Sequence, residues 1–140
     1  MLRAVVLVLT VCLCGCSSQE ADLAGQRQDT QASYDAAIEA LEKHDYGLAE
    51  TRLTEAIEGG GLRIDQLVDA YIQRAVCYAR LGKFEAAHAD LDQIEGGAPD
   101  LDVVYAARSF VFQKEGRTSE AAAKLNQARR LNPRVQTFED

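Results

Sequence analysis

The side chains best suited to chemistry in this chain are its four cysteine thiols, three of which stand close together near the amino terminus. Cys12, Cys14 and Cys16 occupy alternate positions, whereas Cys77 stands alone far along the chain. A disulfide framework distributes paired cysteines over a domain, and a zinc site needs a second ligand pair at suitable spacing. Neither pattern is present. Cys77, with no base close by in the sequence, is interpreted as a small buried apolar residue.

The other titratable residues do not form a catalytic pattern either. His44 and His88 are isolated, and His88 has only Asp92, a weak ligand, one helical turn later. The glycine runs at 59–61 and 96–97 lack the Gly-Lys-Ser/Thr of a phosphate loop and are interpreted as helix ends. We therefore expect a non-catalytic protein, not an enzyme, with no cofactor and no bound metal.

The amino-terminal residues predict export. Arg3 supplies a positive charge ahead of an apolar run over residues 4–13. A membrane-spanning helix needs roughly 20 apolar residues, so this run is too short to cross a bilayer and is typical of a signal peptide.

The four residues at 13–16, Leu-Cys-Gly-Cys, resemble the bacterial lipobox, in which an aliphatic residue, a small residue and Gly or Ala precede a lipidated Cys. The resemblance implies a signal peptide over residues 1–15, cleavage after Gly15 and lipid attachment, palmitate included, at Cys16. Each buried acyl CH₂ contributes about 0.8 kcal/mol, so two or three chains hold a protein on a membrane. Ser17 replaces the Asp that often retains such lipoproteins at the inner membrane, which implies the outer membrane of a diderm cell, facing the periplasm. An ordinary secreted protein or an uncleaved anchor is the alternative.

The rest of the chain predicts one small helical domain behind a linker. Residues 16–28 are polar and predict a lipidated Cys with a flexible tether, with a frayed helix from Glu20 as the alternative. Residues 29–135 are rich in Ala, Leu, Glu, Arg and Gln, which favours an all-α domain, and 136–140 form a short tail. The net charge of −7 argues against binding to nucleic acid.

A helix-turn-helix pattern is clearest in the middle of this domain. Residues 68–81 and 84–95 each place apolar side chains at helical spacing. Gly82 between them suits the left-handed backbone that ends a helix, and Pro99 prevents continuation of the second helix. The segment 68–101 is therefore predicted to form one structural unit.

The same unit recurs on both sides of the middle one. A shift of 34 residues carries it onto residues 102–135, with Gly116 at the turn. A shift of 38 carries it onto residues 29–63, where His44 stands in place of the turn glycine. Because one such helix pair cannot bury its apolar face alone, about three units are the minimum for a stable stack.

This pattern resembles the tetratricopeptide repeat (TPR), a 34-residue helix-turn-helix. The resemblance implies a short right-handed superhelix of about three stacked repeats. It also implies small residues at the eighth and twentieth positions of each unit, where the two helices cross closely. The residues assigned to this packing, with the turn glycines, are Ala37, Ala49, Ala75, Gly82, Ala87, Ser109, Gly116 and Ala121.

The resemblance further implies a concave groove lined by the first helix of each unit. The assigned positions are Tyr34, Ile38, Leu41, Ile72, Val76, Ala79, Ala106, Phe110 and Gln113. This face is mostly apolar and lacks the Lys and Asn of the carboxylate clamp found in some TPR proteins, so it suits an amphipathic helix or an extended apolar segment. The alternative is that these side chains pack between neighbouring helices, or are covered by the chain's own amino-terminal segment.

Together these patterns predict a TPR lipoprotein of the bacterial envelope, a membrane-anchored scaffold that recruits a protein or peptide partner or helps to assemble an envelope complex. A permanent, pilotin-like structural subunit of a pilus or secretion assembly is the first alternative. A carrier of small apolar ligands is the second, and less favoured, alternative.

Overall fold

The structure, a computed structural model, describes residues 16–139, and over this range it contains six α-helices and no strand. The all-α prediction is confirmed. The predicted signal peptide, residues 1–15, lies outside the described residues. The helices are α1 (Cys16–Glu42), α2 (Tyr46–Gly59), α3 (Ile64–Arg80), α4 (Phe84–Glu95), α5 (Leu101–Lys114) and α6 (Thr118–Leu131).

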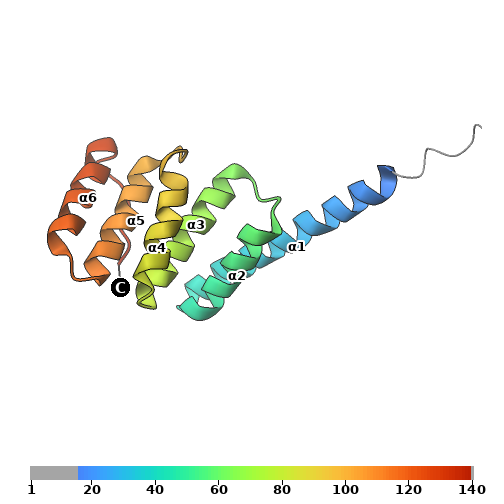
Figure 1. The fold of residues 1–140 in the computed structure, drawn as a ribbon, viewed down its shortest axis with the longest axis horizontal. Coiled ribbons are helices and arrows are strands. Elements are labelled where there is room, and N and C mark those ends of the chain that lie inside the picture. The colour runs from blue at the N-terminus through green and yellow to red at the C-terminus, as the bar shows by residue number, and fades with distance from the viewer. Residues whose placement is uncertain (1–15, 140) are drawn as a thin grey trace, which may run out of the picture.

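Consecutive helices lie side by side along the molecule, in the order of the chain (Figure 1). The closest packing is within the pairs α1–α2, α5–α6 and α3–α4. Successive pairs join through contacts of α3 with α2 and of α5 with both α3 and α4. The helices therefore form three consecutive hairpins, and the middle hairpin packs against both of the others.

The start of α3 differs from the sequence prediction, which placed it near residue 68. The helix begins at Ile64, directly after Gly60 and Gly61, which both have positive φ. Gln66 reaches back to accept a hydrogen bond from the backbone N–H of Arg63, at 3.4 Å, and this bond satisfies one of the donors left open at a helix start. The loop between the first two hairpins is thus shorter than expected.

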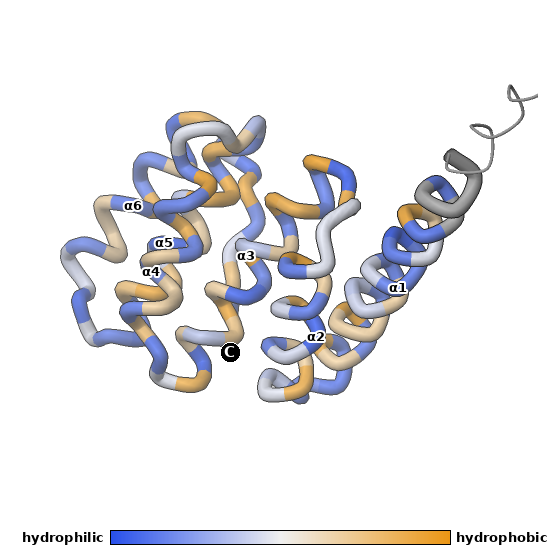
Figure 2. Tube along the Cα trace, turned by 45° about the vertical axis from the view of Figure 1, so that its right-hand side comes forward, coloured by the Kyte–Doolittle hydropathy of each residue, from blue (hydrophilic) through white to orange (hydrophobic). Residues whose placement is uncertain are grey.

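The structure corrects the prediction of a flexible tether over residues 16–28, because this segment is helical and continuous with the rest of α1. It contains no proline and several strong helix formers. The Gln26 side-chain amide donates to the carbonyl of Gly59 at 2.6 Å and so joins α1 to the end of α2. Residues 22–29 are nevertheless exposed, and this part of α1 projects beyond the hairpins (Figure 1). Most of the residues in this part are hydrophilic (Figure 2).

The turns inside the three hairpins are built alike. His44, Gly82 and Gly116 have φ values of 57°, 74° and 80°, so all three adopt the left-handed conformation. In each turn the following backbone N–H returns to a carbonyl of the preceding helix, as in a Schellman motif. These bonds join Asp45 to Ala40 at 2.9 Å, Lys83 to Tyr78 at 2.8 Å, and Arg117 to Phe112 at 2.9 Å. His44 therefore takes the backbone role that glycine has in the other two turns.

The small residues predicted at the helix crossings are buried there. Ala37, Ala49, Ala75 and Ala87 have no exposed surface, and Ser109 and Ala121 are each 8% exposed. In the last hairpin the Ser109 hydroxyl donates to the backbone carbonyl of Ala121 at 2.8 Å, so these two positions are in direct contact. Close approach of the two helices leaves no room for larger side chains at these positions.

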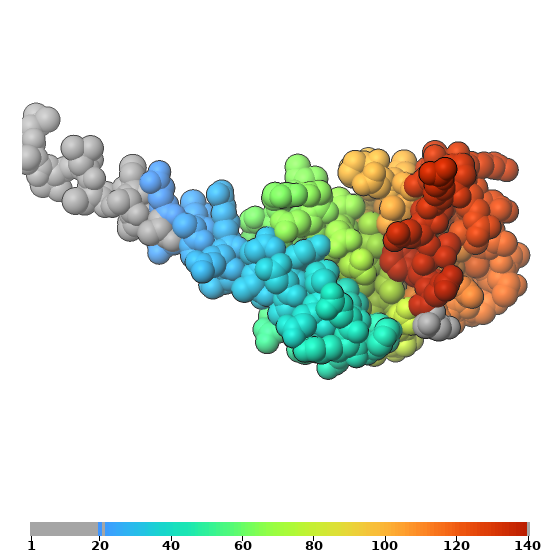
Figure 3. All heavy atoms as spheres, turned by 180° about the vertical axis from the view of Figure 1, so that it is seen from behind, coloured from blue at the N-terminus to red at the C-terminus, as the bar shows by residue number. Residues whose placement is uncertain are grey.

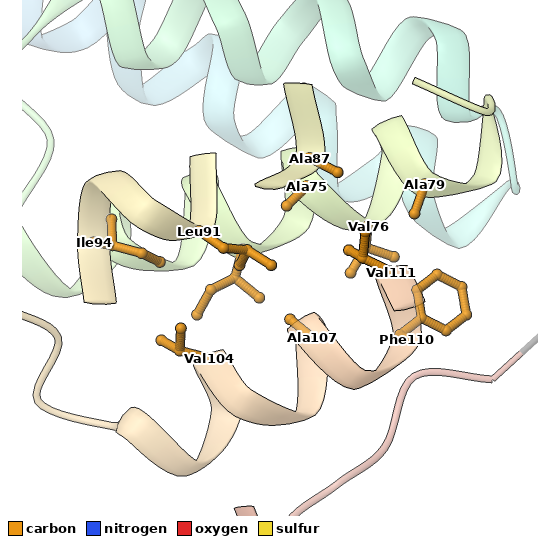
Figure 4. Packing of buried hydrophobic residues seen from close by; sticks show 11 residues of the cluster. Ala75, Val76, Ala79, Ala87, Leu91, Ile94, Val104, Ala107, Phe110 and Val111 are labelled. Carbon is orange, nitrogen blue, oxygen red and sulfur yellow. The ribbon is translucent and has the colours of Figure 1, made fainter. Parts of the chain in front are cut away.

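The apolar core consists of two clusters that meet at α3. One cluster joins α3, α4 and α5 and includes Leu91, Val104 and Val111 (Figure 4). The other joins α1, α2 and α3 and includes Leu53 and Cys77. Because α3 contributes side chains to both clusters, it is the central element of the fold.

Two arginines at equivalent repeat positions, Arg74 largely buried and Arg108 buried, hold neighbouring helices together. Arg74 of α3 forms two bonds to the Asp90 carboxylate of α4, at 2.7 and 2.8 Å, and one to the Thr54 hydroxyl of α2, at 3.1 Å. Arg108, which stands 34 residues later, bonds to Asp92 and Glu95 of α4, each at 2.7 Å. Both arginines connect their own helix to a helix of the preceding hairpin.

Substitution Asp90→Ala tests the Arg74 interaction. Asp90 is only 7% exposed, so its loss leaves a buried guanidinium without its carboxylate. We expect the free energy of unfolding to fall by about 3 kcal/mol, measured by urea denaturation with an unchanged m value.

The matched control is Asp92→Ala, on the same helix. The Asp92 side chain is 70% exposed and Arg108 keeps Glu95, so a loss below about 1 kcal/mol is expected. Equal losses in the two variants would contradict the assignment of Arg74–Asp90 as a buried interaction.

Candidate functional site

The residues predicted to line a groove divide into two sets. The apolar ones on α3 and α5 are buried, with exposed fractions of 2–4%, namely Ile72, Val76, Ala79, Ala106 and Phe110. Those on α1, namely Tyr34, Ile38 and Leu41, are half-buried, and Gln113 is exposed. The expectation of one open apolar groove across all three units is therefore corrected, since its α3 and α5 part is filled.

Packing between helices accounts for most of this burial. Ile72, Val76, Ala79 and Phe110 all belong to the cluster between α3, α4 and α5. Figure 4 shows Val76 next to Val111 and the Phe110 ring at the edge of the cluster. For these four residues, the structure agrees with the alternative prediction, that the side chains pack between neighbouring helices.

The α1 residues of the predicted groove also contact other parts of the fold. The Tyr34 hydroxyl donates to the Asp69 carboxylate of α3 at 2.6 Å, so it joins the first hairpin to the second. Burial and this hydrogen bond raise the pKa of Tyr34 above its ordinary value. Tyr34 and Leu41 pack against the cluster between α1, α2 and α3, which leaves their outer edges accessible.

The carboxyl-terminal segment, residues 132–139, covers part of the same face. After α6 ends, Asn132 has extended backbone, and its side-chain amide donates to the Asp102 carboxylate near the start of α5 at 2.8 Å. The N–H of Val135 returns to the Asn132 carbonyl at 3.0 Å, which turns the chain back. Figure 3 shows the segment on the outside of the molecule, between α6 and the helices in the middle of the chain. The covering segment is thus the carboxyl-terminal one, whereas the sequence suggested the amino-terminal one.

The segment ends on Phe110. The ring of Phe138 lies 6.2 Å from the ring of Phe110, centroid to centroid, with 52° between the planes. Phe138 is half-buried and packs against the cluster between α3, α4 and α5. The segment therefore runs along α5, from Asp102 in its first turn to Phe110, about one turn before its end.

Cationic side chains surround the Phe110 ring. The guanidinium carbon of Arg80 lies 5.0 Å from the centroid of the Phe110 ring and 4.6 Å from that of the Tyr46 ring. The Lys114 ammonium lies 5.4 Å from the Phe110 centroid. Arg80 also donates a hydrogen bond to the backbone carbonyl of Glu139. We call Tyr46, Arg80, Phe110 and Lys114 the aromatic–cationic site.

The aromatic–cationic site brings together groups suited to non-covalent contacts. It presents an aromatic face, two cations and a donor to a backbone carbonyl. Cation–π contacts of this kind contribute about 0.5–1 kcal/mol each when exposed and about 2 when desolvated.

Sequence reasoning assigned Phe110 to a binding face but missed Tyr46, Arg80 and Phe138. An aromatic residue in the otherwise polar segment Gln136–Glu139 was the available signal.

The other reactive side chains, those of Cys77 and His88, are buried or paired within the fold. Cys77 is fully buried, and burial raises the pKa of its thiol to about 12, so the thiol is protonated at neutral pH. His88 of α4 lies 3.2 Å from the carboxylate of Glu115, which caps the end of α5. Within the described part of the chain, no three His, Cys, Asp or Glu residues stand together as a metal site would require.

Comparisons with protein-family models, with curated proteins and with solved structures gave no significant match. The likeness to the TPR therefore depends on the chain's own repeat and its turns. None of the helices in residues 16–139 is both long and apolar enough to cross a membrane.

Substitution Phe138→Ala tests whether the carboxyl-terminal segment packs on the fold in solution. Loss of a half-buried ring against Phe110 is expected to lower the free energy of unfolding by about 1–2 kcal/mol. Amide hydrogen exchange in the last turn of α5 should also become faster. Thr137→Ala, at an exposed neighbouring position, is the control and should change stability by less than about 0.5 kcal/mol. No difference between the two variants would mean that the segment does not dock.

Proposed function

We propose that this chain is a TPR lipoprotein and acts as a membrane-anchored, non-catalytic adaptor of the bacterial envelope. The observation that carries the proposal is the combination of three hairpins with the same turn hydrogen bonds and a lipobox-like sequence at Cys16. In this proposal the hairpins form a short right-handed superhelix, and its concave face binds a segment of a protein partner.

The position of the lipid supports this role. Helix α1 begins at Cys16, and the exposed part of the helix separates Cys16 from the hairpins. A helix rises about 1.5 Å per residue, so residues 16–29 would span roughly 20 Å and carry the binding face away from the bilayer. The exposed surface of residues 22–29 suits such a spacer.

The concave face supports peptide recognition. Ile38 and Gln113, assigned to this face on the first and last hairpins, remain accessible, and the aromatic–cationic site adds a binding end near Phe110. An extended segment bound there would bury aromatic or aliphatic side chains. Its backbone carbonyls would accept hydrogen bonds from side chains such as Arg80.

Lipidation is tested by metabolic labelling with palmitate. Cys16→Ala should lose the label, because the acyl acceptor is removed. Cys12→Ala is the matched control, since it removes a nearby thiol outside the lipobox-like sequence, and it should keep the label. Labelling that survives in Cys16→Ala would refute the anchor.

Partner binding is tested by photo-crosslinking in the native envelope. A photoreactive residue at Gln113, on the proposed concave face, should give a discrete adduct with another envelope protein. The same residue at the exposed position Glu85, on α4, should not give that adduct. Absence of an adduct at both Gln113 and Ile38, or the same adduct at Glu85, would contradict the proposed binding face.

A further inference from the structure

We propose that residues 132–139 are an internal competitor for the partner, and that the partner presents an extended segment with an aromatic residue followed by an acidic one. This inference rests on the proposed function, because it concerns what the concave face binds. The partner and the carboxyl-terminal segment compete for the aromatic–cationic site.

The docked segment shows which kind of peptide the site accepts. One of its contacts uses a group that any peptide could provide, the Glu139 carbonyl, which accepts a hydrogen bond from Arg80. The Phe138 ring is the side chain that fills space next to Phe110. The site therefore selects an aromatic residue in an extended backbone.

The charge around the site favours an acidic neighbour for that aromatic residue. Arg80 and Lys114 both lie within 5.4 Å of the Phe110 centroid, whereas the chain as a whole carries a net charge of −7. An acidic segment is thus repelled by most of the protein and attracted at this site. The chain's own segment follows the same pattern, since Glu139 and Asp140 come directly after Phe138.

Much of the segment lies at the protein surface, as exchange with a partner requires. Gln136, Thr137 and Glu139 are exposed, and Phe138 is only half-buried. The contacts that fix it include the Asn132–Asp102 bond at its start and the Phe138 and Glu139 contacts at its end. The α3 and α5 side chains beneath belong to the core, so displacement of the segment exposes Phe110 without opening a hairpin.

Covalent attachment makes the segment an effective competitor. A short connection gives an effective concentration on the order of millimolar, so the docked segment blocks weak ligands and yields to a tighter partner. Removal of its anchoring ring should therefore increase the affinity of the site for an added peptide of the same chemistry.

The experiment uses a fluorescent peptide with the sequence of residues 132–140, Asn-Pro-Arg-Val-Gln-Thr-Phe-Glu-Asp, and the purified full chain in detergent. Anisotropy titration should show binding to the Phe138→Ala chain at least about tenfold tighter than to the unmodified chain, equivalent to about 1.4 kcal/mol. The chain with Thr137→Ala should behave like the unmodified chain. A peptide with Ala in place of Phe should lose most of the binding.

Two outcomes would overturn the inference. The first is equal or absent peptide binding by the unmodified and Phe138→Ala chains, with helical circular dichroism showing that both are folded. The second is a stable dimer, seen by light scattering, that dissociates in Phe138→Ala, because the segment of a second copy would then occupy the site.

The two proposals can fail separately. If the peptide does not bind but the Gln113 adduct forms, the competitor inference is wrong and the adaptor proposal stands. If the peptide binds but no adduct forms, the site recognises its segment and the adaptor proposal is wrong.

Discussion

The constraint on which the fold depends is that one helical hairpin cannot bury its apolar surface alone. The middle hairpin meets this constraint on two sides, since α3 contributes Val76 to one cluster and Cys77 to the other. Adjacent residues on a helix point in different directions, so a helix that is apolar on both sides must lie between two neighbours. The order of the hairpins follows from this requirement, and Arg74 adds a polar link at the same junction.

The two ends of the stack differ in the surface that they present. In α6 only Ala121 and Ala128 are buried, so the outer side of this helix is polar and can end the stack without a further helix. At the other end α1 continues past its partner α2 as an exposed helix. The carboxyl-terminal segment completes the cover of α5 at Phe110. Termination of the stack therefore uses polar surface at one end and a folded-back segment on the face.

Local and periodic features could be predicted from the sequence, whereas contacts between distant, non-repeated residues could not. The turn at Gly82 and the burial of Ala75 depend on backbone conformation and helix crossing, which recur with the repeat. The Arg74–Asp90 pair required knowledge of which helix faces point toward each other. The Phe138–Phe110 contact joins an irregular segment to a helix, and no periodic signal marks such a pair. For residues 16–28, low hydrophobicity favours disorder whereas helix propensity favours a helix, so the sequence carries conflicting signals for this segment.

Burial within the predicted groove limits where a partner could bind. Val76 and Ala79 are covered by other helices, and exposing them would separate hairpins and lose much of the core. Phe110 differs, since part of its cover is the half-buried Phe138, which a short segment supplies. Domains retain only about 5–15 kcal/mol of net stability, so a binding event that opened the core would unfold the chain, whereas displacement of one ring would not. A ligand on this face must therefore bind at the Phe110 end, along the accessible edge of α1, or across both.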